Sequence, residues 1–152
     1  MKRLRVVIPL VVAGVVGLVS TALAESKAEM LVEQRQAAMI LLGKYFGPLG
    51  GMLKGKVTYD AKVVVRNAEF MEALAKMPWD GFDPSTQGAK SAALPAVFAN
   101  GAKFKEAGEH LQAETAKLVS LAKSGDEAAV KAQVGAVGKA CGSCHDDFRA
   151  KD

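Results

Sequence analysis

The residues best suited to chemistry gather near the C-terminal end of the 152-residue chain. Cys141 and Cys144 are its only cysteines, and His145, one of two histidines, follows them directly. In a Cys-x-x-Cys-His sequence, two thiols can bond the two vinyl groups on one edge of a haem while the adjacent imidazole reaches the iron. The spacing therefore predicts one covalently bound haem c with His145 as an axial ligand.

Other uses of paired cysteines fit this sequence less well. A Cys-x-x-Cys redox centre usually accompanies a βαβ unit, and the chain shows no strand pattern. A tetrahedral zinc site needs a fourth ligand, for which only His110 and scattered carboxylates are available. A disulfide between Cys141 and Cys144 would close a loop too short to stabilise the fold much.

The first 24 residues are predicted to be a secretory signal peptide. A basic start, MKRLR, precedes the uncharged run VVIPLVVAGVVGLV of 14 residues, and Ala22 and Ala24 form a small-residue cleavage site. The run is shorter than the roughly 20 apolar residues that a membrane span needs. We expect cleavage after Ala24, export to the periplasm, a mature domain of residues 25–152 and no membrane partner.

The net charge of +4 belongs mostly to this leader. Of the 20 lysines and arginines, three (Lys2, Arg3 and Arg5) are lost with it, which leaves 17 against 16 aspartates and glutamates. No dense basic run remains after Ala24, so the sequence does not predict nucleic-acid binding.

The mature chain has the periodicity of amphipathic helices. A first helix is predicted to open over 27–46 and a second to cover 59–77, and residues 77–94, rich in turn-forming residues, are predicted to form one long loop. The helices have apolar stripes at Val32, Met39, Leu42, Phe46, Leu49 and Leu53, and at Ala61, Val64, Ala68, Met71 and Ala75.

Two more helices are predicted after the loop. The third starts near Pro95, and the fourth runs from about Asp126 to Ala150 behind a capping box of Ser124 and Glu127. Their stripes are Val97, Phe104, Leu111 and Leu118, and Val130, Val134, Val137, Cys141, Cys144 and Phe148. The pattern predicts an all-α, antiparallel four-helix bundle whose last helix forms one wall of the haem pocket.

The chain resembles the cytochrome c′ family of class II c-type cytochromes. The resemblance covers residues 25–152 and rests on the stretches RQAAM, KGKVTYDA, MPWDGF and GKACGSCHDDFR. It implies a four-helix bundle, often a homodimer, with one covalent haem c. It also implies a five-coordinate, high-spin iron that binds NO and CO and discriminates against oxygen.

The resemblance also implies roles for individual residues around the haem. They are Cys141 and Cys144 for the thioether links, His145 for the iron, Arg149 beside it on the proximal side, Arg35 and Gln36 for the propionates, and Lys90 and Ser91 as further propionate contacts. Trp79 and Phe82 are expected to pack against the haem or within the long loop.

The resemblance places Met39 over the distal face of the haem, and whether its sulfur binds the iron decides between two predicted functions. Methionine sulfur is a good sixth ligand to haem iron, and low-spin class II cytochromes that use a first-helix methionine carry electrons. Methionine is also a common core filler. We expect a non-ligating Met39 that guards an open iron; the alternative is a His/Met-ligated electron carrier with an unknown redox partner. An enzyme is not expected, because His110 lies among charged residues and supplies no distal acid–base group.

Overall fold

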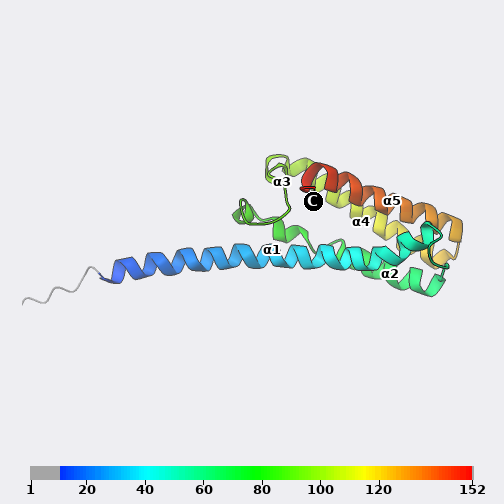
Figure 1. Ribbon diagram of the computed structural model, residues 1–152, viewed down its shortest axis with the longest axis horizontal. Coiled ribbons are helices and arrows are strands. Elements are labelled where there is room, and N and C mark those ends of the chain that lie inside the picture. Colours follow the sequence, from blue (N-terminus) through cyan, green and yellow to red (C-terminus); the bar gives the residue numbers. More distant parts are fainter. Residues whose placement is uncertain (1–10, 152) are drawn as a thin grey trace, which may run out of the picture.

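A computed structural model describes the backbone of residues 11–151 and the side chains of residues 27–151. Its helices are α1 (Val11–Leu53), α2 (Ala61–Leu74), α3 (Ala96–Ala99), α4 (Gly101–Ser124) and α5 (Glu127–Phe148), with two 3-10 turns, η1 (Trp79–Phe82) and η2 (Pro84–Thr86), before α3. The four longer helices pack along one another (Figure 1). The predicted all-α four-helix bundle is confirmed.

The first helix is longer than predicted. It begins at Val11 and continues through Ala24, the predicted cleavage point, while residues 1–10 of the predicted signal peptide lie outside the described residues. Pro48 does not end the helix, which runs on to Leu53. In the part of the chain that the structure describes, no helix has the length and hydropathy needed to cross a membrane.

The core lies where the four long helices meet. Most predicted stripe residues are buried, but Leu53 is 39 % exposed and Met52 takes its place in the core. Met52 belongs to the buried cluster formed by the four long helices, whereas Leu53 lies at the edge of that cluster, beside Gly135 of α5. Ala61 is also exposed, because it opens α2 at the end of the bundle.

The predicted third helix is two helices, since Asn100 leaves the helical region between α3 and α4. The predicted capping box is also wrong. Gly125 ends α4 with a left-handed φ of 81°, which leaves Ser124 inside α4, where its hydroxyl donates to the carbonyl of Leu121. Asp126 caps α5 instead, accepting a 3.0 Å hydrogen bond from the N–H of Ala129.

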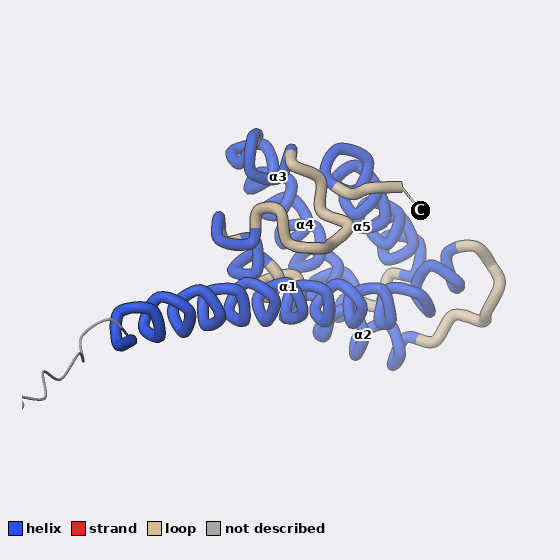
Figure 2. The backbone as a smooth tube through the Cα atoms, turned by 60° about the vertical axis from the view of Figure 1, so that its left-hand side comes forward, coloured by secondary structure: helices blue, strands red, loops and turns tan. Residues whose placement is uncertain are grey.

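The loop over 77–94 is more ordered than predicted, because it holds η1 and η2. Its end pairs with the C-terminal segment. The N–H of Leu94 donates to the carbonyl of Phe148 at 2.9 Å, and that of Ala150 to the carbonyl of Ala92 at 2.8 Å. Figure 2 shows this loop beside the C-terminal tail, both in tan. The pairing ties the loop to the end of α5 that carries the cysteines.

Candidate functional site

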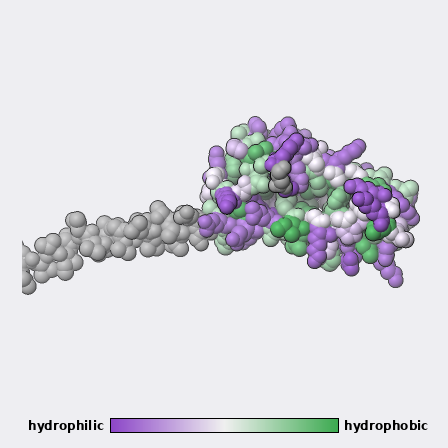
Figure 3. Space-filling model, in the orientation of Figure 1, coloured by the Kyte–Doolittle hydropathy of each residue, from purple (hydrophilic) through white to green (hydrophobic). Residues whose placement is uncertain are grey.

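A cavity of about 600 Å³ lies between α1 and α5, within the range of small-molecule sites. On the face shown in Figure 3, one group of hydrophobic residues (green) lies near the middle of the molecule, with hydrophilic residues (purple) beside it. Apolar side chains dominate the lining. They include Met39, Ile40, Leu42, Phe46, Met71, Val97 and Leu111, together with the aromatic rings of Trp79, Phe82, Phe104 and Phe148.

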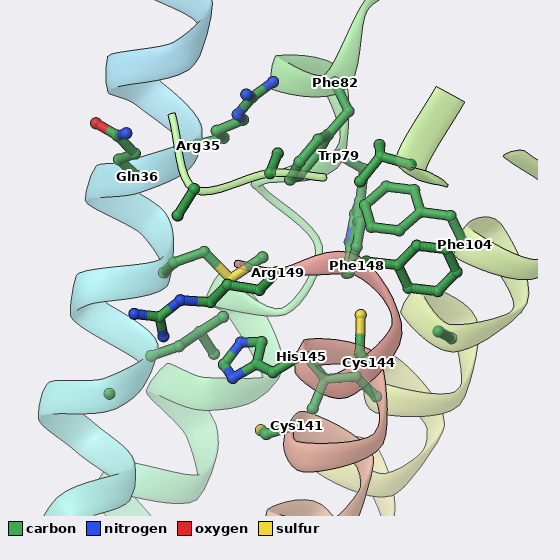
Figure 4. A pocket seen from close by; sticks show the side chains of 18 of the residues that line it. Arg35, Gln36, Trp79, Phe82, Phe104, Cys141, Cys144, His145, Phe148 and Arg149 are labelled. Atoms are coloured by element: carbon green, nitrogen blue, oxygen red, sulfur yellow. The ribbon is translucent and has the colours of Figure 1, made fainter. Parts of the chain in front are cut away.

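One wall of the cavity is the last part of α5. Cys141, Cys144 and His145 all line it, and Figure 4 shows His145 pointing from α5 toward α1. The two cysteines lie about one turn apart on the face that Val137 and Phe148 bury in the core. No disulfide joins them. The sequence-predicted cluster is therefore assembled on one side of one cavity.

The electrostatics of this wall disfavour a redox dithiol. Burial raises the pKa of the Cys141 thiol, and burial with the nearby Cys141 and Asp147 raises that of Cys144. Cysteines that exchange disulfides have lowered pKa values instead. Burial also lowers the pKa of His145, and Arg149 lowers it further. At neutral pH the imidazole is uncharged, which is the form that binds a metal.

The opposite wall is part of α1. Met39 is half-buried, Ile40 is 71 % exposed at the rim, and Gly43 follows one turn after Met39. Gln36 also lines the cavity, but Figure 4 shows its amide pointing away from His145. Met39, Ile40 and Gly43 have no side-chain N–H or O–H. The wall that faces His145 is therefore apolar.

Arg35 joins α1 to the long loop and is only 3 % exposed. Its Nη1 donates to the carbonyl of Gly81 at 2.6 Å and to Thr86 Oγ1 at 3.0 Å, and its Nη2 donates to Ser91 Oγ at 2.9 Å. The guanidinium carbon lies 4.4 Å from the ring centroid of Phe82. Burial lowers the pKa of Arg35, but arginine remains charged in proteins.

Thr86 is a site residue that the sequence analysis missed. It is 1 % exposed, accepts a hydrogen bond from Arg35 and donates one from Oγ1 to the carbonyl of Asp83 at 2.7 Å. The Asp83-Pro84 pair indicates a turn, and a threonine hydroxyl close to a turn can donate a hydrogen bond to a backbone carbonyl within it. That local signal does not reveal the arginine 51 residues earlier.

An aromatic cluster closes one end of the cavity. The ring centroid of Phe104 lies 5.7 Å from Trp79, 4.7 Å from Phe82 and 5.1 Å from Phe148. Phe104 and Phe148 were predicted only as core residues. Trp79 lies flat against Gly108, where an added Cβ would come within 2.9 Å of the ring. Trp79 and Phe82 thus pack within the loop and against the cavity together.

The remaining predicted residues divide between the cavity and the surface. Ser91 and Arg149 line the cavity, and Figure 4 shows the Arg149 side chain extending toward α1 near His145. Lys90 is exposed and is not among the lining residues. The side chain of His110 is 59 % exposed and lies 3.4 Å from a carboxylate oxygen of Glu114, away from the cavity as predicted.

The residues present fit a haem c. An apolar cavity would hold the ring, Cys141 and Cys144 would link to one edge, and the neutral His145 points inward. The three hydrogen bonds of Arg35 all go to uncharged oxygens, so they leave its charge unneutralised. A buried guanidinium with unneutralised charge suits a propionate carboxylate.

The family model for cytochrome C′ matches residues 30–149. The chain belongs to the cytochrome c′ family. As a member of that family it binds haem c covalently, and its Cys-x-x-Cys-His sequence is the attachment motif. The roles of the other cavity residues stay predictions that their positions support.

Individual members of the cytochrome c′ family match most of the chain. Cytochrome c′ of Rubrivivax gelatinosus is 40 % identical over 121 residues, which are 79 % of this chain and 94 % of that protein. Its crystal structure gives a TM-score of 0.75 over 78 % of this chain and 94 % of that one. Cytochrome c prime from Shewanella frigidimarina, 34 % identical, gives 0.79 over 82 % and 97 %.

Solved structures of cytochrome c prime from Alcaligenes xylosoxidans include complexes with gases. A ferrous arginine-to-lysine variant with bound NO is 33 % identical with a TM-score of 0.76. A variant with bound carbon monoxide is 34 % identical with a TM-score of 0.75. Each alignment covers 82 % of this chain and 97 % of the other.

Proposed function

We propose that this protein is exported to the periplasm, where it binds NO and CO at a five-coordinate haem iron and serves to sequester NO or to pass electrons. The NO and CO complexes of the homologous Alcaligenes xylosoxidans protein support gas binding. The proposed protein is a binding and carrier protein rather than an enzyme.

The apolar α1 wall opposite His145 carries the proposal. The haem supplies an iron that binds diatomic gases. His145 would hold that iron from α5, while the half-buried Met39 and the rim residue Ile40 line the opposite wall. These side chains donate no hydrogen bond, and bound oxygen gains more from a donor than NO or CO does. Pocket polarity and steric access would therefore favour NO and CO over oxygen.

The lining of the cavity also argues against catalysis. No aspartate or glutamate is among the described lining residues, and His110 lies on the surface. Activation of peroxide or oxygen needs an acid–base group on the side where the substrate binds. A pocket with this lining suits reversible binding.

The test is the absorption and EPR spectra of the ferric and ferrous holoprotein, with CO then added to the ferrous form. High-spin ferric iron and ready CO uptake are expected. In Met39→Ala, the spin state should stay high and CO should bind faster, because a steric guard is lost. A low-spin spectrum with a sulfur-to-iron band that disappears in Met39→Ala would instead establish the His/Met electron carrier, since Met39 lines the cavity opposite His145.

Export is proposed from the leader sequence alone. N-terminal sequencing of protein recovered from the periplasmic fraction should begin at Glu25. Protein that retains residues 1–24, or that stays in the cytoplasm, would contradict this part of the proposal.

A homodimer through α1 and α2 is also proposed. Leu41 is 38 % and Phe70 is 44 % exposed, and the ring of Phe70 lies 4.7 Å from that of Tyr45, one turn after Leu41. These residues make an apolar strip across both helices, of the kind that a second copy covers. Light scattering should give a dimer mass for the holoprotein and a monomer mass for Phe70→Lys. A monomer mass for the wild type would refute the dimer.

A further inference from the structure

Residues 91–94, here called the strap, pair with the segment that leaves α5. Ala93 lies opposite Arg149 as an antiparallel pair. The hydrogen bonds donated by the N–H groups of Leu94 and Ala150 flank this pair, one on each side. Two residues paired in this way present their side chains on the same side of the strands, and Ala93 and Arg149 both line the cavity. The strap and Arg149 therefore form one continuous part of the cavity wall.

The pairing fixes the backbone on both sides of Arg149. The carbonyl of Phe148, just before it, accepts the 2.9 Å hydrogen bond from Leu94. The N–H of Ala150, just after it, donates the 2.8 Å hydrogen bond to Ala92. The N–H of Arg149 itself bonds to a carbonyl in the last turn of α5 at 3.1 Å. Because both flanking peptide groups are held, the φ of −120° and the ψ of 136° are fixed, and with them the direction in which the side chain leaves the backbone.

The strap is itself held by the opposite wall of the cavity. The hydroxyl of Ser91 accepts a 2.9 Å hydrogen bond from Arg35 of α1 and a 3.3 Å hydrogen bond from the N–H of Ala93. Arg35 is buried and makes two further hydrogen bonds to the long loop. The strap is therefore anchored to α1 through Ser91 and to the end of α5 through its backbone pairing.

Figure 4 shows where this backbone directs the Arg149 side chain, which extends toward α1 beside His145. A long side chain just past the end of a helix would otherwise sample many directions. A guanidinium close to the iron that His145 would hold repels the extra positive charge of the ferric state. The ferrous state is therefore favoured when Arg149 is close, and this effect weakens when the side chain moves away.

We propose that pairing of the strap with the C-terminal tail, residues 149–151, holds Arg149 beside His145 and thereby raises the reduction potential of the haem. The strap residues and Ala150 are then positioning residues that act through Arg149. This inference goes beyond gas binding, because it requires only the covalent haem of the family.

The test removes one hydrogen bond of the pair by the substitution Ala150→Pro. Proline has no N–H, and the backbone angles of Arg149 are those that a residue before proline adopts. Ala150→Ser is the matched control, because it changes the same exposed position and keeps the donor. In the Ala150→Pro holoprotein, the amide of Leu94 should exchange with solvent on the order of fivefold faster, and the reduction potential should fall. Ala150→Ser should keep both wild-type values.

An Arg149→Ala background shows whether the effect on the potential passes through Arg149. Arg149→Ala alone should lower the reduction potential further than Ala150→Pro does. In this background, Ala150→Pro should still speed exchange at Leu94 but should no longer change the potential. An equal fall of the potential in both backgrounds would overturn the proposal. Unchanged exchange at Leu94 or an unchanged potential in Ala150→Pro alone would overturn it as well.

Ferric EPR of the same samples distinguishes failure of this inference from failure of the proposed function. The reduction potential can be measured for high-spin and low-spin haem alike, so the test does not depend on whether Met39 binds the iron. A low-spin wild type whose potential falls in Ala150→Pro would refute the five-coordinate iron and support this inference. A high-spin wild type whose potential ignores Ala150→Pro would refute this inference alone.

Discussion

Replacing Arg35 with methionine should destabilise the whole domain by detaching the long loop from α1. Methionine keeps a long side chain but removes every donor. The variant loses the hydrogen bonds to Gly81, Thr86 and Ser91, and it leaves the Gly81 carbonyl without its 2.6 Å partner.

The size of the loss follows from what each partner can do afterwards. The hydroxyls of Thr86 and Ser91 can rotate to other partners, and Thr86 already donates to the Asp83 carbonyl. The buried carbonyl of Gly81 cannot, and an unsatisfied group of that kind costs about 1–3 kcal/mol. The variant no longer buries a charged guanidinium, and the desolvation cost that is avoided offsets part of the loss of three charge-assisted hydrogen bonds. We expect a net loss of about 3 kcal/mol in the free energy of unfolding, or about 10 °C in Tm.

The assay is denaturant unfolding of the holoprotein, followed by far-UV circular dichroism and by fluorescence of Trp79, the only tryptophan. Gln34→Met is the matched control, because Gln34 is an exposed neighbour of Arg35 on the same helix and does not line the cavity, and it should change stability by less than about 0.5 kcal/mol. Arg35→Lys, which keeps the charge but not the forked donors, should fall between the two. Equal stability of Arg35→Met and Gln34→Met would refute the reasoning.

Three further predictions concern other parts of the fold. Gly108→Ala should lower the free energy of unfolding by about 1–3 kcal/mol and shift the Trp79 emission, because the added Cβ forces the ring to move. Asp126→Ala should lower it by about 1 kcal/mol through loss of the α5 cap. Hydrogen bonds from Ser85 lower the pKa of Asp83, so their stabilising effect is complete above about pH 4 and is lost as pH falls through the folded-state pKa. An NMR titration should show this pKa rising in Ser85→Ala.

Each of these has a control within the chain. An added Cβ at Gly101 meets no atom within 4 Å, so Gly101→Ala should not reduce stability, and an equal loss there would contradict the packing argument for Gly108. Ser124→Ala should lower the free energy of unfolding by less than Asp126→Ala does. The reverse order would support Ser124 as the cap of α5. An unchanged Asp83 pKa in Ser85→Ala would refute the hydrogen-bond assignment.

Helical periodicity predicted much of the fold because it reports which face of each helix meets the others. Periodicity failed where burial of a residue depended on which other element packs against it. Met52 rather than Leu53 enters the core, and both are apolar, so the pattern could not choose between them. The α3–α4 break at Asn100 and the cap at Asp126 likewise depend on backbone angles that neighbouring residue types only bias.

The sequence by itself determined the haem chemistry, because Cys141, Cys144 and His145 lie within five residues on one helix, where spacing alone sets their relative positions. Only the tertiary structure placed the α1 wall opposite them. It also joined Arg35 to loop residues 46 to 56 positions later. Contacts over such separations arise from packing of whole elements, which a local pattern does not record. The wall that carries the cysteines and His145 is therefore readable in the sequence, whereas its contacts across the cavity are set by the fold.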